Sequence, residues 1–298
     1  MRPKVFIIIL NYNGWKDTRE CLKSLEVLNY NNFEVIVVDN GSKEKLKCES
    51  LNFKIVQFFN KENLGFSRGN NIGIKYALEN NTNYILLLNN DIIARPDFLE
   101  KLVKVAENDK KTGILGPRIY KYSLDKSLNK VHFAGGKINW LYTKAIHQKR
   151  AEYKQTLNSD YITGACMLIK RKVIDKIGLM PEKYFLYFED VDWCLKAQRA
   201  GYKCVLVPNA KIWHKVSQST KPGSFSYIYY HTRNGLLLAK RNAPFFIKTI
   251  ACLNGFFVYF KQVLKLIIFP SKRKWSKAIM LGISDFYKNK FGKYENRN

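Results

Sequence analysis

The chain has 298 residues, of which 46% are hydrophobic and 25% charged, the composition of an ordinary globular protein. This length allows one large domain or one domain with an appendage, and the composition excludes a disordered, collagen-like or coiled-coil protein. The 51 basic residues outnumber the 24 acidic ones and give a net charge of +27, so the protein should bind polyanions such as nucleic acid, anionic lipid or a phosphorylated substrate.

The positive charge is concentrated near the C-terminus. Residues 1–210 carry a net charge of +12, whereas the shorter stretch 211–298 carries +15 and contains only Asp285 and Glu295 as acids. This asymmetry predicts two parts with different tasks, which we place at residues 1–220 and 221–298.

Two features predict a cytosolic protein. The apolar run Val5–Leu10 has six residues, fewer than the roughly 7–15 of a secretory core, and a turn at residues 11–14 follows it in place of a cleavage site. We therefore expect a buried strand there and no signal peptide. The six cysteines form no Cys-x-x-Cys pair, so we expect reduced and mostly buried thiols.

Residues 5–107 predict an alternation of strands and helices. Runs rich in β-branched residues indicate strands, and apolar residues recur at helical spacing between them. The predicted strands are Val5–Leu10, Glu34–Val38, Phe53–Phe58 and Tyr84–Leu88, and the predicted helices are 17–28 (capped by Asp17 or Thr18), 67–80 and 94–107. Connections of this length favour right-handed crossovers and a mostly parallel sheet, the α/β class.

The rest of the chain is less regular. Residues 113–165, with His132 and His147, predict irregular or antiparallel structure that lines an acceptor side. Further on, the pattern predicts a strand at Ala165–Lys170, a short helix ending at Gly178, a helix from the acidic residues 189–192 to Gly201, and a strand at Cys204–Val207 closed by Pro208.

Residues 245–269 are apolar and aromatic but are interrupted by Lys248, Lys261 and Lys265. Lysines at a bilayer centre are costly, so an amphipathic helix in the membrane interface fits better than a spanning helix. A basic cluster at 272–277 suits anionic lipid. The alternative is that this segment packs as an ordinary helical subdomain.

Polar clusters at 11–14, 39–42 and 89–91 follow three predicted strands, where ligands bind in parallel sheets. A carboxylate in such a place, Asp91 or Asp39, could coordinate a divalent cation or simply close a turn. Near them, glycines at positions 65, 69 and 73 share one helix face, which requires close approach of a ligand or of another backbone.

Glu189, Asp190 and Asp192 place three carboxylates in four residues behind an aromatic run. Acidic residues cap a helix start, but one acid is enough for that, and a carboxylate beside a sugar hydroxyl could act as a general base. His214 by itself is more typical of a structural histidine than of a ligand.

Together these motifs resemble the inverting glycosyltransferases of family 2, in particular the rhamnosyltransferase-like branch. The resemblance covers residues 5–215 and is carried by Ile9–Asn13, Val38–Ser42, Asn63–Phe66, Asn89–Asp91, Gly164–Ala165, Phe188–Asp192 and His214. It implies a GT-A fold and sugar transfer from a nucleoside diphosphate donor, with Mg²⁺ or Mn²⁺ as cofactor.

The resemblance also implies roles for single residues. Asp190 would be the catalytic base, with Glu189 or Asp192 orienting it or the acceptor. Asn89 stands where many members have aspartate, so the metal would rest on Asp91 and the diphosphate, helped by His214. The implied donor-nucleotide residues are Asn11, Tyr12, Asp39, Asn63, Gly65, Arg68 and Asn90.

The basic tail suggests a glycan or lipid-linked acceptor and a peripheral location on the cytoplasmic face of the membrane. Two other classes of protein share some of these sequence features. A nucleic-acid-binding protein would explain the charge, but no nucleic-acid module signature is present, and we expect no nucleic-acid partner. A nucleotidyltransferase would share the architecture but needs a glycine-rich basic loop after the first strand, where residues 11–14 read Asn-Tyr-Asn-Gly.

Overall fold

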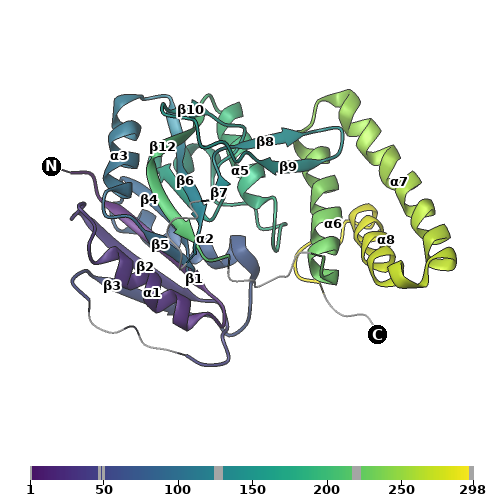
Figure 1. Cartoon of the computed structure of the whole chain (residues 1–298), viewed down its shortest axis with the longest axis horizontal. Coiled ribbons are helices and arrows are strands. Elements are labelled where there is room, and N and C mark those ends of the chain that lie inside the picture. The colour runs from purple at the N-terminus through teal and green to yellow at the C-terminus, as the bar shows by residue number, and fades with distance from the viewer. Residues whose placement is uncertain (1, 46–47, 49–50, 124–129, 217–222, 295–298) are drawn as a thin grey trace.

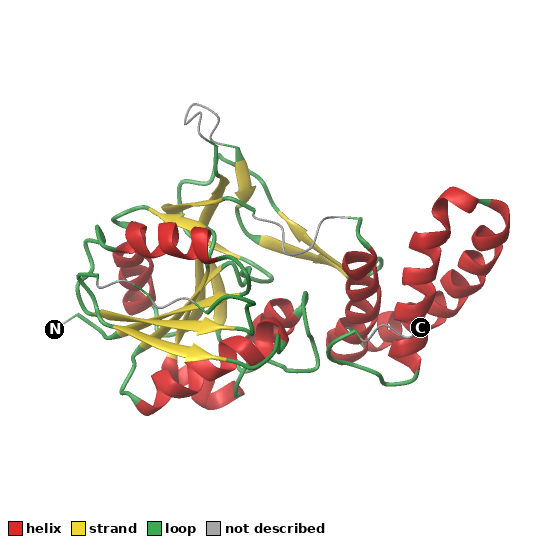
Figure 2. Ribbon diagram, turned by 90° about the horizontal axis from the view of Figure 1, so that it is seen from below, coloured by secondary structure: helices red, strands yellow, loops and turns green. Residues whose placement is uncertain are grey.

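The computed structural model describes residues 2–45, 48, 51–123, 130–216 and 223–294. Helices pack on both faces of a central sheet, and three C-terminal helices stand beside it (Figures 1 and 2). The boundary that we predicted between residues 220 and 221 lies outside the described residues.

The first part of the sheet is parallel. Strand β1 lies between β2 and β4, β2 also pairs with β3, and all these pairings are parallel. Helix α1 connects β1 to β2, and α2 connects β3 to β4, so strands and helices alternate as the sequence predicted. The elements are β1 (Val5–Asn11), α1 (Trp15–Leu25), β2 (Phe33–Asp39), β3 (Ile55–Phe59), α2 (Gly65–Glu79) and β4 (Tyr84–Asn89).

The remaining strands make the sheet mixed. Its order is β10-β12-β6-β11-β4-β1-β2-β3, with β11 antiparallel to both neighbours and β12 parallel to β6. The described part of region 113–165 contains short strands joined by irregular segments, including an antiparallel β8–β9 hairpin beside the sheet. The elements are β5 (Ile92–Ala94), α3 (Phe98–Asn108), β6 (Thr112–Lys121), β7 (Val131–Phe133), β8 (Gly136–Asn139), β9 (Lys144–His147), β10 (Leu157–Asn158), β11 (Cys166–Lys170), α4 (Arg171–Ile177), α5 (Glu189–Arg199) and β12 (Lys203–His214).

The core lies around β1, whose residues Val5–Ile9 have no exposed surface. This strand is the buried element that the sequence predicted. Helix α2 packs closely on it: a Cβ on Gly69 would lie 2.5 Å from Leu10, and one on Gly73 would lie 2.7 Å from Ile8. Close packing of helix on sheet therefore explains these two glycines. All six cysteines are free thiols, four of them buried, as expected.

Three boundaries differ from the prediction. Helix α1 begins at Trp15, and its N-cap is Gly14, which has no side chain with which to cap it. Asp17 and Thr18 therefore lie inside the helix, where the Thr18 hydroxyl donates to Asn11 Oδ1 at 3.0 Å. Strand β12 does not stop at Pro208 but passes it through an irregularity in its pairing with β6, a place where a missing N–H is tolerated. Residues 92–94 form strand β5, so helix α3 begins only at Phe98.

The C-terminal region consists of α6 (Phe225–Asn242), α7 (Phe245–Ile268), a short 3₁₀ turn (Pro270–Lys272) and α8 (Arg273–Tyr287). Ser224 caps α6 by accepting the Tyr227 N–H at 3.2 Å. Helices α6 and α8 add residues such as Leu237 and Phe286 to the main core, so they pack against the sheet domain.

Helix α7 lies on the far side of this bundle (Figure 1). Only Ala251, Gly255 and Gln262 of its residues are buried. It is the one helix among the described residues that is long and apolar enough to cross a membrane. Such a composition is also compatible with a helix that lies along a surface.

Candidate active site

A pocket of about 1400 Å³ opens at the carboxyl edge of the parallel strands and continues to the C-terminal helices. Parallel pairing explains this position, because the register places Leu10 beside both Val38 and Asn89 and so brings three strand ends together. Eight of the residues predicted from the sequence line it: Tyr12, Asn63, Gly65, Asn90, Asp91, Glu189, Asp190 and His214.

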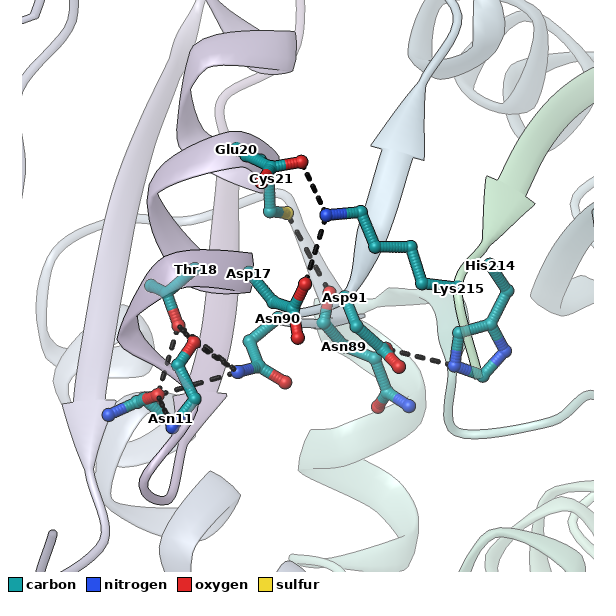
Figure 3. A network of polar contacts seen from close by, with 11 residues as sticks. Asn11, Asp17, Thr18, Glu20, Cys21, Asn89, Asn90, Asp91, His214 and Lys215 are labelled. Carbon is teal, nitrogen blue, oxygen red and sulfur yellow. Dashed lines mark hydrogen bonds and ion pairs between the residues drawn. The ribbon is translucent and has the colours of Figure 1, made fainter. Parts of the chain in front are cut away.

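Amide side chains hold the floor of this edge together. Asn11, at the end of β1, donates to Asp39 Oδ2 at 2.8 Å and to Ser42 Oγ at 3.1 Å. Asn90 donates to Thr18 Oγ1 at 3.1 Å and to Gly14 O at 3.2 Å (Figure 3). These bonds tie the ends of β1, β2 and β4 to the start of α1. They therefore fix the backbone positions from which the neighbouring residues enter the pocket.

A second network of amide side chains holds the N-terminus of α2. Asn40 donates to Asn63 Oδ1 at 3.0 Å and to Gly65 O at 3.1 Å, and Asn63 Oδ1 also accepts from Gly65 N at 2.9 Å. Gly65 has a φ of +83° and its position for a Cβ lies 2.5 Å from Phe185 O, so only glycine fits. Close approach of another backbone explains this third glycine.

Asp91 and His214 meet because β5 pairs with β12 in a register that sets Ile92 opposite His214. His214 Nε2 lies 2.9 Å from Asp91 Oδ1, and both side chains are nearly buried (Figure 3). Lys215 donates its N–H to Asp91 O at 3.0 Å, while its ammonium pairs with Asp17 at 2.9 Å and with Glu20 on α1. This clamp between β12 and α1 was not predicted, since nothing local in the sequence marks it.

Asp190 also lines the pocket and lies at the start of α5. Its carboxylate accepts two backbone N–H bonds, from Gly164 and Val191, each at 2.8 Å. Loss of hydration raises the pKa of Asp190, and the two N–H donors oppose this rise. Burial and the charge of Asp190 raise the pKa of Glu189 well above its usual range. A carboxylate with a raised pKa is suited to accept a proton near neutral pH.

Four predicted residues are not brought into the pocket. Asp192 is 1% exposed and binds Arg241 Nε and Asn242 Nδ2 of α6, each at 2.8 Å, so it joins two helices. Arg68 points to the surface and pairs with Glu182 at 3.2 Å. Asn11 and Asp39 are fully buried beneath the rim. Each had a sequence signal, but only tertiary packing decides which way a side chain points.

The region 113–165, which we expected to line the acceptor side, contributes His132, His147 and Tyr161 to the pocket, although none of the three was predicted as a catalytic, donor-binding or metal residue. His132 and His147 lie edge to face with ring centroids 5.4 Å apart, and His132 is 5.6 Å from the ring of His214. Burial lowers the pKa of both His132 and His147 to about 4, so they are neutral at physiological pH. Tyr161 also lines the pocket. These residues come from irregular segments whose isolated histidines and tyrosine form no motif.

The pocket contains two adjacent side chains that could coordinate a divalent cation. The described residues contain no group of three or more His, Cys, Asp or Glu side chains arranged to hold a metal. Asp91 and His214 instead supply one carboxylate and one imidazole in contact at the pocket wall. Mg²⁺ and Mn²⁺ are commonly bound by one or two protein ligands together with substrate phosphates and water, so these two side chains fit such an ion.

The mixed, mostly parallel sheet, the helices on both of its faces and the polar carboxyl edge are those of the GT-A fold. A solved structure with this fold, the mannosyltransferase PcManGT from Pyrobaculum calidifontis in complex with GDP-Man and Mn²⁺, matches with a TM-score of 0.58 at 14% identity, over 97% of this chain and 88% of that chain.

The sequence comparisons name the family. Residues 6–178 match the model of glycosyl transferase family 2, and the chain belongs to this family and is a glycosyltransferase. The dTDP-rhamnosyl transferase RfbF of Shigella flexneri is 26% identical over 81% of this chain and 82% of its own. The N-acetylglucosaminyl-diphospho-decaprenol L-rhamnosyltransferase of Mycobacterium tuberculosis is 24% identical over 80% and 84%. The family and fold predicted from the motifs are confirmed.

Proposed function

We propose that this glycosyltransferase moves a sugar, with inversion, from a nucleoside diphosphate donor to a hydroxyl of a lipid-linked glycan. The observation that carries the proposal is the single pocket that contains both the Asp91–His214 pair and the Asp190 carboxylate. In this proposal, Asp91 and His214 hold the donor diphosphate through a cation, and Asp190 deprotonates the acceptor.

The donor side is proposed at the edge of the parallel strands. Tyr12 is 44% exposed at the pocket rim, where its ring is available to a nucleotide base. Asn63, Gly65 and Asn90 line the same side. Asn11 and Asp39 act from beneath, by fixing the strand ends through their hydrogen bond. Arg68 is left out, because its guanidinium is engaged by Glu182 at the surface.

Asp190 is proposed as the general base. Its raised pKa makes it a better proton acceptor than an ordinary aspartate, and the Gly164 and Val191 N–H groups hold its carboxylate in place. As the acceptor oxygen attacks the anomeric carbon, its proton passes to Asp190 and the bond to the diphosphate breaks on the opposite face. This single displacement inverts the anomeric configuration. Glu189, buried beside Asp190, modulates that charge.

Asp91 and His214 would hold the divalent cation, Mg²⁺ or Mn²⁺. When bound, such an ion supplies positive charge against the developing negative charge of the departing diphosphate. The chain itself would contribute the position of that charge, since the β5–β12 pairing and the Lys215 clamp hold Asp91 in the pocket that Asp190 also lines.

The acceptor is proposed to approach from the C-terminal helices. Beyond Asp190 the pocket is lined by apolar residues of α7 and α8, including Val258, Ile279 and Ile283. The outer face of α7 exposes Phe246 and Phe257 to solvent at 79% and 70%, and the basic cluster at 272–277 follows the helix. These features support a peripheral site on an anionic, cytoplasmic membrane face, with residues 223–294 as the membrane-facing part.

The test is a thermal-shift screen of UDP-, dTDP- and GDP-linked sugars with Mn²⁺, followed by a transfer assay on a polyprenyl-diphosphate-linked sugar. We expect one nucleotide to raise Tm and its sugar nucleotide to support transfer with inversion. Because two relatives are rhamnosyltransferases, dTDP-rhamnose is the first donor to try. Transfer with retention, or no stabilisation by any of these nucleotides, would contradict the proposal.

A further inference from the structure

The two residues before the catalytic pair have an unusual backbone. Tyr187 and Phe188 have φ values of 71° and 74°, the left-handed region that bulky side chains rarely adopt. Such a backbone is strained and persists only where its surroundings hold it. Phe188 is the N-cap residue of α5. The turn therefore sets the direction of the side chains of Glu189 and Asp190, the first two residues of the helix.

Helix α6 holds the turn by hydrogen bonds. Asn234 has no exposed surface, and its amide nitrogen donates to Leu186 O at 2.8 Å and to Tyr187 O at 3.1 Å. Both amide hydrogens are therefore used on the turn. The amide oxygen accepts from Arg233 Nε at 3.0 Å, which fixes the orientation of the amide.

The same helix holds the turn by ring contacts one helical turn earlier. The His231 ring stacks on Tyr187 with centroids 4.4 Å apart at 30° and meets the edge of Phe188 at 5.4 Å. Tyr227 covers the His231 ring from 4.2 Å. Burial lowers the pKa of His231 to about 4, so the ring acts here as a neutral aromatic plate.

We propose that Asn234 and His231 of α6 are positioning residues for the transfer reaction: they hold the left-handed turn at Tyr187 and Phe188 and thereby the direction of Asp190. This inference rests on the proposed role of Asp190 as base. It makes α6 part of the catalytic unit, although α6 belongs to the C-terminal region.

The first experiment compares Asn234→Leu with Asn242→Leu in the full-length protein. Asn242 lies on the same helix but binds Asp192 and Leu238 O, so it serves as a matched structural control. A misplaced catalytic group costs about 100-fold in rate, so Asn234→Leu should lower kcat by about that factor, with donor KM and the Kd of the nucleotide with Mn²⁺ changed less than about twofold. Asn242→Leu should lower Tm to a similar extent without that loss of kcat.

Hydrogen exchange of segment 184–189 reports on the turn without any substrate. It should be faster in Asn234→Leu than in wild type and unchanged in Asn242→Leu. The His231 pair is an independent route if Asn234→Leu does not fold: His231→Ala should lose turnover, and His231→Phe, which keeps a ring on Tyr187, should recover most of it.

Wild-type kcat and normal exchange in Asn234→Leu, or equal loss in His231→Phe and His231→Ala, would overturn the positioning role alone. Full activity in Asp190→Asn would instead overturn the proposed base, and the positioning role with it.

Discussion

The two ends of this chain treat apolar residues in opposite ways. On β1, Val5–Ile9 are completely buried, and the strand lies in the middle of the sheet. On α7, the side chains of Phe245, Phe246 and Phe257 are between 70 and 79% exposed. The sheet domain thus buries its apolar residues within the fold, whereas α7 exposes apolar side chains, the property on which its proposed contact with a membrane rests.

This contrast separates two tasks that meet at α6. In the proposed function, the polar edge of the sheet domain holds the donor, and the apolar, basic face of the C-terminal helices meets the membrane. Helix α6 connects them, because it shares the main core through Leu236 and Leu237 and holds the turn before Asp190 through Asn234. Five measurements test this division of tasks between the sheet domain and the C-terminal helices.

The largest effect is expected at the base. Asp190→Asn should lower turnover by about 10²–10⁴-fold, because the acceptor proton loses its carboxylate while the fold is kept. Turnover is measured with the donor identified by the thermal-shift screen, and Asp175→Asn, an exposed residue paired with Arg171, is the matched control. Near wild-type transfer by folded Asp190→Asn would show that the base lies elsewhere.

The metal pair should come next. Asp91→Asn should lower turnover by about 10²–10³-fold by weakening charge stabilisation at the diphosphate, with a smaller loss for His214→Ala. Calorimetry of nucleotide binding should show dependence on Mn²⁺ in the wild type and little in Asp91→Asn. Unchanged activity in excess EDTA would remove the cation from the proposal.

The apolar face is tested by the triple change Phe246→Ser, Phe257→Ser and Leu264→Ser. Since burying a large apolar side chain contributes roughly 1.5–3 kcal/mol, binding to anionic vesicles should fall by about 10²-fold or more while Tm stays the same. Val27→Ser, which removes an exposed apolar residue from the sheet domain, is the control. Unchanged co-sedimentation of the triple variant with vesicles would argue against α7 as the membrane face.

A smaller effect is expected from pH. Burial raises the pKa of Asp190, so the acid limb of kcat/KM should lie above the usual range of an aspartate, with activity rising as pH increases. In that window the unfolded chain binds fewer protons than the folded one, so stability falls as pH rises. Asp190→Asn and Glu189→Gln should therefore raise Tm at neutral pH by about 2 °C or more, and a lower Tm in both would contradict the raised pKa values.

The smallest effect is expected at Arg68. An exposed ion pair contributes about 0–1 kcal/mol, so Arg68→Ala should change Tm and donor KM little. An increase in donor KM above about tenfold for Arg68→Ala alone would show that this guanidinium turns into the pocket when the nucleotide binds.

The family and the frame of the fold could be predicted from the sequence because they depend on local patterns. The apolar run at Val5–Leu10, the helical spacing after it and the polar residues at the strand ends each signal their own structure, and parallel pairing then brings the strand ends to one edge. For the same reason, Tyr12, Asn90 and Asp91 of the pocket could be predicted from motifs next to strand ends.

Tertiary structure decided what those side chains do. Asp192 was expected to orient Asp190 or the acceptor, but the packing of α5 on α6 pairs it with Arg241. Asp91 meets His214 only through the pairing of β5 with β12, across more than a hundred intervening residues. The hold of Asn234 on the turn before Asp190 likewise joins segments that are distant in sequence. Local sequence specifies strands, helices and turns, whereas the direction of a functional side chain depends on which distant element is packed against it.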